Sequence, residues 1–472
     1  MYDHVILISL DTLRSDCIAA NPYKLWPYTH PSGRQPRTGV LDYTAGEGAF
    51  FSTCISAAPY TSASHASFFT GMWPLKHGVF EFFNRKLTAP TLFTLARRNG
   101  YRTVFKTDFP IILGPFLGFE RDIDNYVVED DEEFLSSLKS TERSFNFVHF
   151  GGIHIPYGFH NLRYGGDAYR RKVAEMEEEI PRQEGFLADS LVESYRDDED
   201  MELLLRYKRC VQYHYAHGNY DKLFSMYLDG VSHFCETRFG LFFERLIGLL
   251  KGRRFLLVIF GDHGEEYDAD SYGHHNSLSE GVLRVPVIFY GTDIPPSHHH
   301  ARIRSVDVAP TVVDLLGLPA SQRRDMDGVS LADTILHGAA YPERSAFAQA
   351  YTNDTREFVD FQKRLLASGR KTGALRHVLY KEAFYEGDFK VTRQSYHYAE
   401  HGGISQLRPC PQRITLERRD ASARWHAGAD AATQTRMLAE LDAYNLTRKG
   451  GAADREVPDH IRQQLINMGY RV

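Results

Sequence analysis

The sequence predicts an α/β fold in which helices flank a central, mostly parallel sheet, followed by a smaller α+β part. Three observations lead to this prediction. Apolar runs such as "HVILISLD" at 4–11 and "RFLLVIFGD" at 254–262 end in an acid and have the composition of strands buried on both faces. Helical segments alternate with these runs, as in a parallel sheet with crossover helices. Beyond about residue 335 hairpin-like segments replace this alternation.

The elements of the first half follow from local patterns. The run at 4–11 is the first strand. Residues 91–108, "TLFTLARRNGYRTVFKTD", predict a helix that ends at Gly100 and a short strand after it. Residues 144–158, "SFNFVHFGGIHIPYG", predict a strand that runs into a turn. The segment at about 160–205 is rich in charge and in helix formers, so we expect a helical insert there. A solvated insert without chemistry is the simpler interpretation, and a lid is the alternative.

The second half continues the alternation of helices and strands. One long helix is expected at 220–250, and the buried strand at 254–262 follows it. "VPVIFYG" at 285–291 predicts a further strand. "SVDVAPTVVDLLGLP" at 305–319 predicts a helix that the Gly-Leu-Pro sequence stops.

The last part of the chain has a different pattern. "HVLYKEAFYEGDFKVTRQSYHYA" at 377–399 predicts antiparallel hairpins, and "TQTRMLAELDAYNL" at 433–446 predicts a late helix. We therefore divide the chain into a main α/β part at 1–335, which includes the helical insert, and a smaller α+β part at 336–472.

The composition is that of an ordinary globular protein, with 43% hydrophobic and 25% charged residues. The formal net charge of −6 gives no electrostatic reason to expect a nucleic-acid partner. No apolar run reaches about 18 residues, so we expect no membrane span. The start of the chain shows no basic region or leader, and we expect a cytoplasmic protein. The cysteines are scattered and odd in number, which argues against a disulfide framework or a thiolate zinc site: Cys17, Cys54, Cys210, Cys235 and Cys410.

Candidate chemistry collects where the predicted strands end. Asp11 ends the first strand, Asp262 and His263 follow the strand at 254–262, and His154 follows the strand at 144–150. Taken singly, these residues are compatible with a helix cap or a structural turn. Ligands of open α/β sheets bind at the carboxyl ends of the strands, so the set together predicts a binding site. An adjacent carboxylate and imidazole suit Zn²⁺ or Mn²⁺.

Two further polar stretches are ambiguous by themselves. "SYGHHNS" at 271–277 places His274 and His275 in a glycine-containing loop, where they are either surface residues or site residues. "PYTSASHASFFTG" at 59–71 carries five aliphatic hydroxyls and one histidine. That stretch is either a polar surface loop or a nucleophile mounted at the start of a helix.

The order of these motifs resembles the sulfatase branch of the alkaline phosphatase superfamily. The resemblance covers about residues 3–335 and is carried by "ISLDTLRSD", "TSASHASFFTGMWPLKHG", "HIPY", "GDHGEE", "GHHNSLSEGVLRVPVIFYG" and "VDVAPTVVDLLGLP…MDGVSL". "YEGDFKVTR" resembles a strand near the carboxyl end of the family. The resemblance as a whole implies the alkaline-phosphatase-like sandwich fold and an activity on esters.

The family's nucleophile position holds a threonine in this chain. Sulfatases carry Cys-x-Pro-Ser-Arg ahead of a Thr-Gly pair, and the cysteine becomes formylglycine. Counted back from 70–71, the cysteine position falls on Thr61, the serine on Ser64 and the arginine on His65. Cys54 lies too far upstream to be the modified residue. The chain is therefore more similar to threonine-type relatives, which include phosphodiesterases, phosphonate monoester hydrolases and phosphoryl transferases.

The resemblance also implies roles for individual residues. Those expected to act in catalysis are Thr61, His154 and His274. Those expected to bind substrate are Ser64, His65, His77 and His275. Those expected to hold one divalent metal ion are Asp11, Thr61, Asp262 and His263. We expect Mn²⁺ or Zn²⁺ rather than Ca²⁺, because Thr12 stands where calcium-dependent sulfatases have a second aspartate and His263 where many have asparagine.

A second metal site is a weaker hypothesis. "LDGVSH" places Asp229 and His233 four residues apart, on one face of the expected helix. Such a pair supports a second metal in two-zinc relatives. However, alignment on Gly240 moves the family's acid to Glu236, so a solvated helix face is the favoured interpretation.

Together these features predict a metal-dependent hydrolase that cleaves a phosphodiester or phosphonate monoester through a covalent Thr61 intermediate. A phosphoryl transferase and a sulfate ester hydrolase are the alternatives, and a binding protein without activity is the least favoured. The expected partner is a small anionic ester, with no nucleic acid and no membrane, and a homo-oligomer is compatible with the sequence.

Overall fold

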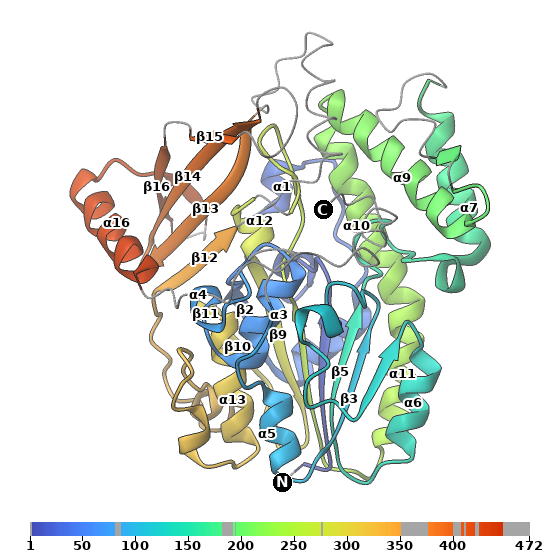
Figure 1. Ribbon diagram of the computed structural model, residues 1–472, viewed down its shortest axis with the longest axis vertical. Helices are drawn as coiled ribbons and strands as arrows, with labels where there is room; N and C mark the ends of the chain where they lie inside the picture. Colours follow the sequence, from blue (N-terminus) through green and yellow to red (C-terminus); the bar gives the residue numbers. More distant parts are fainter. Residues whose placement is uncertain are drawn as a thin grey trace.

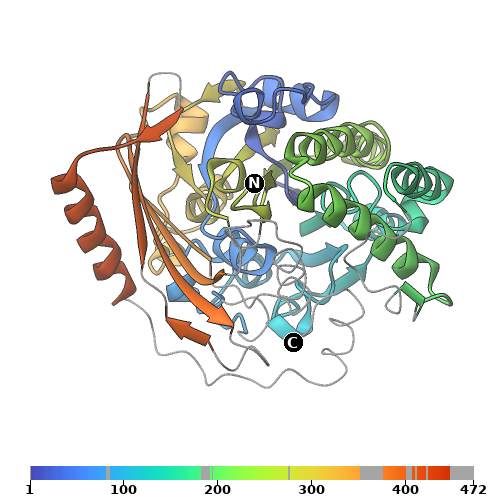
Figure 2. The same cartoon turned by 90° about the horizontal axis from the view of Figure 1, so that it is seen from above.

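The computed structural model describes residues 2–80, 86–181, 192–193, 195–274, 277–350, 376–399, 407–409, 412–420 and 424–446. Helices cover both faces of a central sheet, and a smaller sheet lies beside this sandwich (Figures 1 and 2). The predicted fold class is therefore confirmed.

The central sheet has nine strands in the order β10-β2-β9-β6-β1-β5-β3-β4, with β11 paired to β2. All neighbouring pairs are parallel except those that β9 makes with β2 and β6. The strands are β1 (His4–Leu10), β2 (Ala49–Ile55), β3 (Arg102–Thr107), β4 (Asn125–Val128), β5 (Ser144–Phe150), β6 (Phe255–Gly261), β9 (Arg284–Gly291), β10 (Ser297–His299) and β11 (Ile303–Arg304). The carboxyl ends of β1, β2, β5 and β6 therefore meet at one edge.

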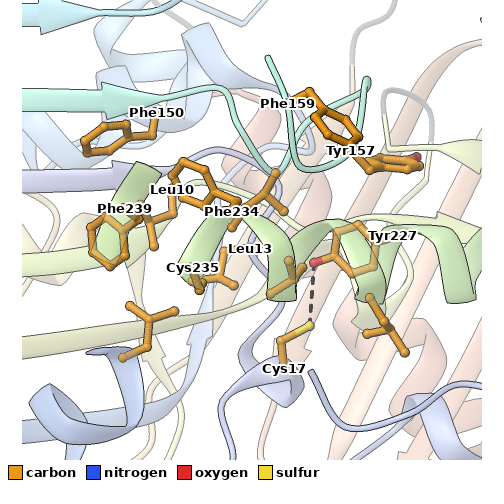
Figure 3. Close-up of a cluster of buried hydrophobic side chains, with 14 of the residues drawn as sticks. Leu10, Leu13, Cys17, Phe150, Tyr157, Phe159, Tyr227, Phe234, Cys235 and Phe239 are labelled. Atoms are coloured by element: carbon orange, nitrogen blue, oxygen red, sulfur yellow. Dashed lines mark hydrogen bonds between the residues drawn. The ribbon is translucent and has the colours of Figure 1, made fainter. Parts of the chain in front are cut away.

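Two hydrophobic clusters fill the spaces on either side of this sheet. The first lies beneath α2 (Gly39–Glu47), α6 (Asp131–Lys139), α7 (Leu162–Glu178), α9 (Glu199–Ala216), α10 (Tyr220–Glu236) and α11 (Arg238–Leu250). Figure 3 shows part of it, where Leu10, Phe150 and Phe234 pack together. The second lies beneath α3 (Thr61–Thr70), α5 (Leu92–Arg98) and α13 (Val308–Leu315).

Short elements complete this part of the chain. They are η1 (Ser15–Cys17), α1 (Trp26–Thr29), α4 (Pro74–His77), η2 (Pro115–Leu117), β7 (Glu266–Tyr267), β8 (Tyr272–Gly273), α12 (Glu280–Leu283), η3 (Ser305–Asp307), η4 (Ala320–Arg323) and α14 (Ala332–His337). None of the described helices is both long and apolar enough to cross a membrane.

The helix predicted at 220–250 is in fact two helices, α10 and α11. Thr237 breaks it with backbone angles of φ −106° and ψ −98°. The Thr237 side chain and backbone N–H both donate to the His233 carbonyl, which closes α10. Arg238 then begins α11 with its guanidinium bound to Asp108 and Asp131. Strand β2 was not predicted, because its sequence "AFFSTCI" mixes apolar and hydroxyl residues without a clear period.

The helical insert is packed against the rest of the fold. In the described part, α7 and α9 lie side by side (Figure 1), and their Tyr169, Val173 and Tyr207 side chains join the first hydrophobic cluster. Ion pairs between Arg170 and Glu199 line the exposed side. The described helices of the insert thus have one buried and one exposed face, and both a solvated insert without chemistry and a lid stay predictions.

The carboxyl-terminal sheet is antiparallel, in the order β12-β13-β14-β16-β17, with β15 paired to β14. Its elements are β12 (Ala346–Ala350), β13 (Arg376–Glu386), β14 (Phe389–Ala399), β15 (Leu407–Pro409), β16 (Arg413–Arg419), β17 (Trp425–Ala427) and α16 (Ala431–Asn445). A third hydrophobic cluster joins the two sheets, with Tyr60 and Leu283 from one side and Ala348 and Tyr385 from the other. The predicted hairpin and late helix are confirmed.

Four cysteines, Cys17, Cys54, Cys210 and Cys235, are buried free thiols. Cys410 lies outside the described residues.

Candidate active site

Three side chains converge where β1 and β6 end. Asp11, Asp262 and His263 each offer a ligand atom within 4.8 Å of the others. His263 Nε2 lies 3.6 Å from Asp11 Oδ1 and 3.4 Å from Asp262 Oδ2. All three residues are buried. Asp11 and Asp262 come close because β1 and β6 are adjacent parallel strands that end in register at Leu10 and Gly261.

The bonding of this cluster fits a divalent cation. Asp11 Oδ1 and Asp262 Oδ2 are buried and have no hydrogen-bond partner among the described residues. A buried carboxylate oxygen left without a partner is costly, and a bound cation removes that cost. Two carboxylates with one imidazole form a donor set typical of Mn²⁺ or Zn²⁺.

The pKa shifts of Asp11, Asp262 and His263 agree with a metal site. Burial and the neighbouring Asp11 charge raise the pKa of Asp262 well above its ordinary value. Burial also acts on Asp11, but a hydrogen bond from His149 and the nearby His154 and His263 outweigh it and lower its pKa. Burial lowers the pKa of His263 to about 4, so its imidazole is neutral at pH 7, the form that binds metals.

Thr61 is the first residue of α3 and faces this cluster. Its Oγ1 lies 3.3 Å from Asp11 Oδ2 and 3.5 Å from His263 Nε2. The preceding Tyr60 has extended angles and makes no side-chain cap hydrogen bond, and the positive end of the helix dipole lies at Thr61. Gly71 ends α3 with φ +65°, as the Thr-Gly motif predicts.

Thr12 and Ser64 each donate a hydrogen bond to Asp262. Thr12 has φ +63°, an unusual value for threonine, and this turn directs its backbone N–H to Asp262 Oδ1 at 3.2 Å. Ser64 Oγ donates to the Asp262 backbone carbonyl at 2.7 Å. Thr12, which stands where calcium-dependent sulfatases have a second aspartate, therefore donates a backbone hydrogen bond to Asp262. Substrate binding by Ser64 stays a prediction.

Both ring nitrogens of His65 and of His77 already have partners. His65 Nδ1 lies 2.7 Å from the Thr61 carbonyl oxygen, and its Nε2 lies 2.8 Å from Ser9 Oγ. His77 Nε2 lies 3.0 Å from Ser67 Oγ, and its Nδ1 accepts from the Val79 N–H at 3.1 Å. Burial lowers the pKa of each ring to about 3. Substrate binding by these rings stays a prediction, and it would require one of these bonds to open.

His154 and His274 meet beside the cluster. Their ring centroids are 5.3 Å apart, and the His274 centroid lies 4.3 Å from that of His263. His274 Nδ1 is 3.2 Å from Glu265 Oε1. Loops that follow different strands thus place two predicted catalytic residues next to the cluster of Asp11, Asp262 and His263, called the metal-type cluster below. His275 lies outside the described residues.

Sequence reasoning missed His149 and Arg14. The buried His149 comes from within β5, and its Nε2 lies 3.1 Å from Asp11 Oδ2. Arg14 binds both oxygens of Asp16 and one of Glu266, and it donates to the Glu265 carbonyl, so it supports the loop after His263. His149 could have been found only as a polar residue within an apolar strand, one position before its end.

The second metal hypothesis is not supported by the described residues. Asp229 is exposed, and His233 packs against the Phe159 ring at 4.8 Å. No third described acid, cysteine or histidine completes a site with them. Glu236 instead pairs with Arg37 at the surface. The solvated helix face is therefore the better description.

The sequence matches the Sulfatase family model over residues 3–318. It is 25% identical over 283 residues, 59% of its length, to the low-salt glycan biosynthesis sulfotransferase Agl7 of Haloferax volcanii. It is 32% identical over 81 residues, 17% of its length, to the choline-sulfatase of Rhizobium meliloti. The chain spans only 56% and 16% of the lengths of these two curated relatives.

Solved structures with the same fold include a 2-O GAG sulfatase, with a TM-score of 0.61 and 17% identity over 95% of this chain and 93% of that one. The phosphonate monoester hydrolase of Silicibacter pomeroyi also has a TM-score of 0.61, with 15% identity over 95% of this chain and 96% of that one.

Proposed function

Because this chain belongs to the sulfatase family, we propose that it is a metal-dependent ester hydrolase that cleaves a phosphodiester or phosphonate monoester through a covalent intermediate on Thr61. The observation that carries the proposal is the place of the Thr61 hydroxyl, at the start of α3 and 3.3 Å from Asp11.

The choice of a phosphorus ester follows from the nucleophile. An unmodified alcohol forms a sulfate ester that is hard to release, whereas a formylglycine hydrate can eliminate its sulfate. Cys54, the nearest cysteine upstream, is buried within β2, and burial raises its pKa well above the ordinary value. It therefore provides no reactive thiolate for catalysis.

The proposed steps use residues of the cluster. Thr61 Oγ1, which lies beside Asp11, attacks phosphorus as its proton is released to water, and the bond to the leaving oxygen breaks. The His274–Glu265 pair supplies the proton to the leaving oxygen. Water then attacks phosphorus and gives a proton to the His274–Glu265 pair, the bond between phosphorus and Thr61 Oγ1 breaks, and Oγ1 regains a proton from solvent.

The metal-binding residues in this proposal are Asp11, Asp262 and His263, with Thr61 adjacent. A divalent cation held there, Mn²⁺ or Zn²⁺ rather than Ca²⁺, would lower the pKa of the Thr61 hydroxyl and offset substrate charge. The unpartnered Asp11 and Asp262 oxygens support this donor set.

The test compares three substrates with protein loaded with Mn²⁺ or Zn²⁺: bis-p-nitrophenyl phosphate, a phenylphosphonate monoester and p-nitrophenyl sulfate. We expect turnover of the phosphorus esters. Thr61→Ala should lower kcat by about a thousandfold or more, as for loss of other covalent nucleophiles. Thr61→Ser, which keeps the hydroxyl, should retain measurable turnover. Quenched wild-type protein should carry a phosphoryl group on the peptide that contains Thr61.

Two outcomes would contradict the proposal. Turnover by Thr61→Ala equal to that of the wild type would show that Thr61 is not the nucleophile. Turnover of the sulfate ester alone would replace the phosphoester assignment with sulfate ester hydrolysis.

Group transfer to an alcohol is the second candidate, because the relative matched over 283 residues is named a sulfotransferase. Transfer differs from hydrolysis only in the acceptor that attacks the intermediate. Product analysis in the presence of added alcohols distinguishes the two, since a transferase forms the new ester in preference to the free acid.

A further inference from the structure

A cavity lies between the central sheet and the carboxyl-terminal sheet. Its volume is about 1030 Å³. It is lined from one side by residues near β9 and β11, and from the other by residues of β16, β17 and the loops beside them. None of Asp11, Thr61, Asp262 and His263 lines it. The cavity is therefore separate from the candidate active site.

Arg284 is a buried cation in the wall of this cavity, only 3% exposed. Its guanidinium donates to the Tyr23 carbonyl at 2.6 Å and forms no ion pair with the described carboxylates. The two acids that act on its charge are Asp16 and Glu280. Asp16 is bound by both ends of the Arg14 guanidinium, and Glu280 by Lys390. The positive charge of Arg284 is thus left without a carboxylate of its own.

Arg302 is the second buried cation of the wall, at 1% exposure. Its Nη1 is buried and has no hydrogen-bond partner among the described residues. Its one acidic partner, Glu343, is 3.3 Å from Nη2 and is shared with Arg419, whose Nη2 lies closer, at 2.9 Å. Burial lowers the pKa of both Arg284 and Arg302, and the nearby acids offset this effect only in part.

The rest of the wall combines aromatic rings with acids that already have partners: Glu280 pairs with Lys390, Glu343 and Asp388 with Arg419, Asp420 with His426, and Asp430 caps α16. Tyr23 packs edge-on against His300, and Tyr385 packs edge-on against Trp425. Guanidinium groups pair with phosphate, sulfate or carboxylate oxygens in a planar, two-bonded geometry, and aromatic faces bind rings. We infer that this cavity binds a small molecule in which an oxyanion, held by Arg284 and Arg302, is carried on a ring-bearing body.

Glu280, which lines the cavity, begins α12, and Arg284, which also lines it, directly follows this helix. The Val282 carbonyl within α12 accepts from the Gly264 N–H at 2.7 Å, and Gly264 directly follows His263. Because Asp11, Thr61, Asp262 and His263 do not line the cavity, we expect its ligand to bind without the metal ion and without the Thr61 hydroxyl.

The experiment measures binding by tryptophan fluorescence, because Trp425 lines the cavity while the other two tryptophans, Trp26 and Trp73, do not. The probes are inorganic phosphate, inorganic sulfate, citrate and glucose 6-phosphate. We expect a saturable signal that is kept in Thr61→Ala and after metal removal by chelation, and lost in Trp425→Phe. Glucose 6-phosphate should bind more tightly than inorganic phosphate, and citrate tests carboxylate as the recognised group.

Variants of the two arginines decide the inference. Arg284→Met should raise Kd about tenfold, the expected effect of losing one charge-assisted hydrogen bond. Arg302→Lys keeps the charge, protects the fold and should weaken binding less than Arg302→Met. Folding of each variant is checked by its thermal transition. The inference is overturned if no probe gives a saturable signal, or if folded Arg284→Met and Arg302→Met proteins bind as the wild type does.

Discussion

At the scale of single residues, His149 controls the geometry of the metal-type cluster. It occupies one oxygen of Asp11 at 3.1 Å and leaves the other, Oδ1, without a partner. A hydrogen bond of this kind keeps a ligand carboxylate in one orientation before the metal binds. His149 is therefore one reason why Asp11 Oδ2 has a hydrogen-bond partner while Oδ1 remains available to a metal ion.

We predict that His149→Gln weakens binding of Mn²⁺ or Zn²⁺ by about 10- to 100-fold, the usual effect of losing a residue that orients a ligand. Isothermal titration with metal-free protein measures it. Asp262→Asn should abolish binding, and Asp229→Asn, an exposed acid on α10, should leave it unchanged. Unchanged affinity in His149→Gln would show that Asp11 needs no such support.

The sequence could predict some of these residues and not others, for a physical reason. Asp11 and Asp262 could be predicted because each directly follows an apolar strand, and such strand ends meet at one edge of a parallel sheet. His149 lies inside its strand, and its contact with Asp11 depends on the pairing of β5 with β1. The occupied nitrogens of His65 depend likewise on the packing of α3 against β1, which residue order alone does not give.

At the scale of elements, close packing of α10 against the loop after β5 positions His154. Gly230 of α10 lies against this loop, and a Cβ added there would approach Tyr157 Cβ to 2.5 Å. Phe234, one turn further, packs beneath the same region, as Figure 3 shows. The glycine permits a helix-to-loop approach that any side chain would prevent.

We predict that Gly230→Ala destabilises the protein by roughly 1–3 kcal/mol, because overpacking outweighs the gain in helix propensity. Gly248→Ala in α11 is the matched control, since nothing lies within 4 Å of the added Cβ. The control should be stabilised by up to about 1 kcal/mol. Urea unfolding of both variants measures the difference, and equal stability of the two would contradict the packing argument.

Element types were predictable where one period dominates, as in β1, β6 and α16. The break at Thr237 was not predictable, because the apolar spacing of α10 continues into α11 without a glycine or proline at the junction. The ion pairs of Arg238 with Asp108 and Asp131 accompany the change of direction, and they join residues more than 100 positions apart.

At the scale of the whole molecule, a buried charge cluster connects the sheet to its helices. Arg238 of α11 and Lys106 of β3 both contact Asp108 and Asp131. Burial alone would raise the pKa of Asp108, but the adjacent Arg238 and Lys106 hold it well below its ordinary value of 3.8. The pKa of Asp131 is lowered in the same way.

This cluster predicts the acid limb of the stability profile. Because the folded-state pKa of Asp108 is depressed, its contribution is complete above pH 3.8 and is lost as the pH falls towards the folded-state value. Asp108→Asn should lower the free energy of unfolding at pH 7 by roughly 3 kcal/mol and flatten this limb. Urea unfolding from pH 7 down to about pH 2 measures both effects.

The control for that series is Glu132→Gln, which removes an exposed partner of Arg245 and should change neither quantity appreciably. An acid limb of the same steepness in Asp108→Asn would assign the loss of stability to other carboxyl groups.

The hydrophobic cluster shared by the two sheets has a consequence for how the protein unfolds. Tyr60, which directly precedes Thr61, packs in one cluster with Ala348 and Tyr385 of the carboxyl-terminal sheet. Tyr385 also donates to Glu280 of α12 at 2.7 Å. Neither sheet can open without exposing apolar surface of the other, so thermal melting should follow a single cooperative transition. Cutting the chain near residue 335 would then remove part of the core on which the first turn of α3 rests.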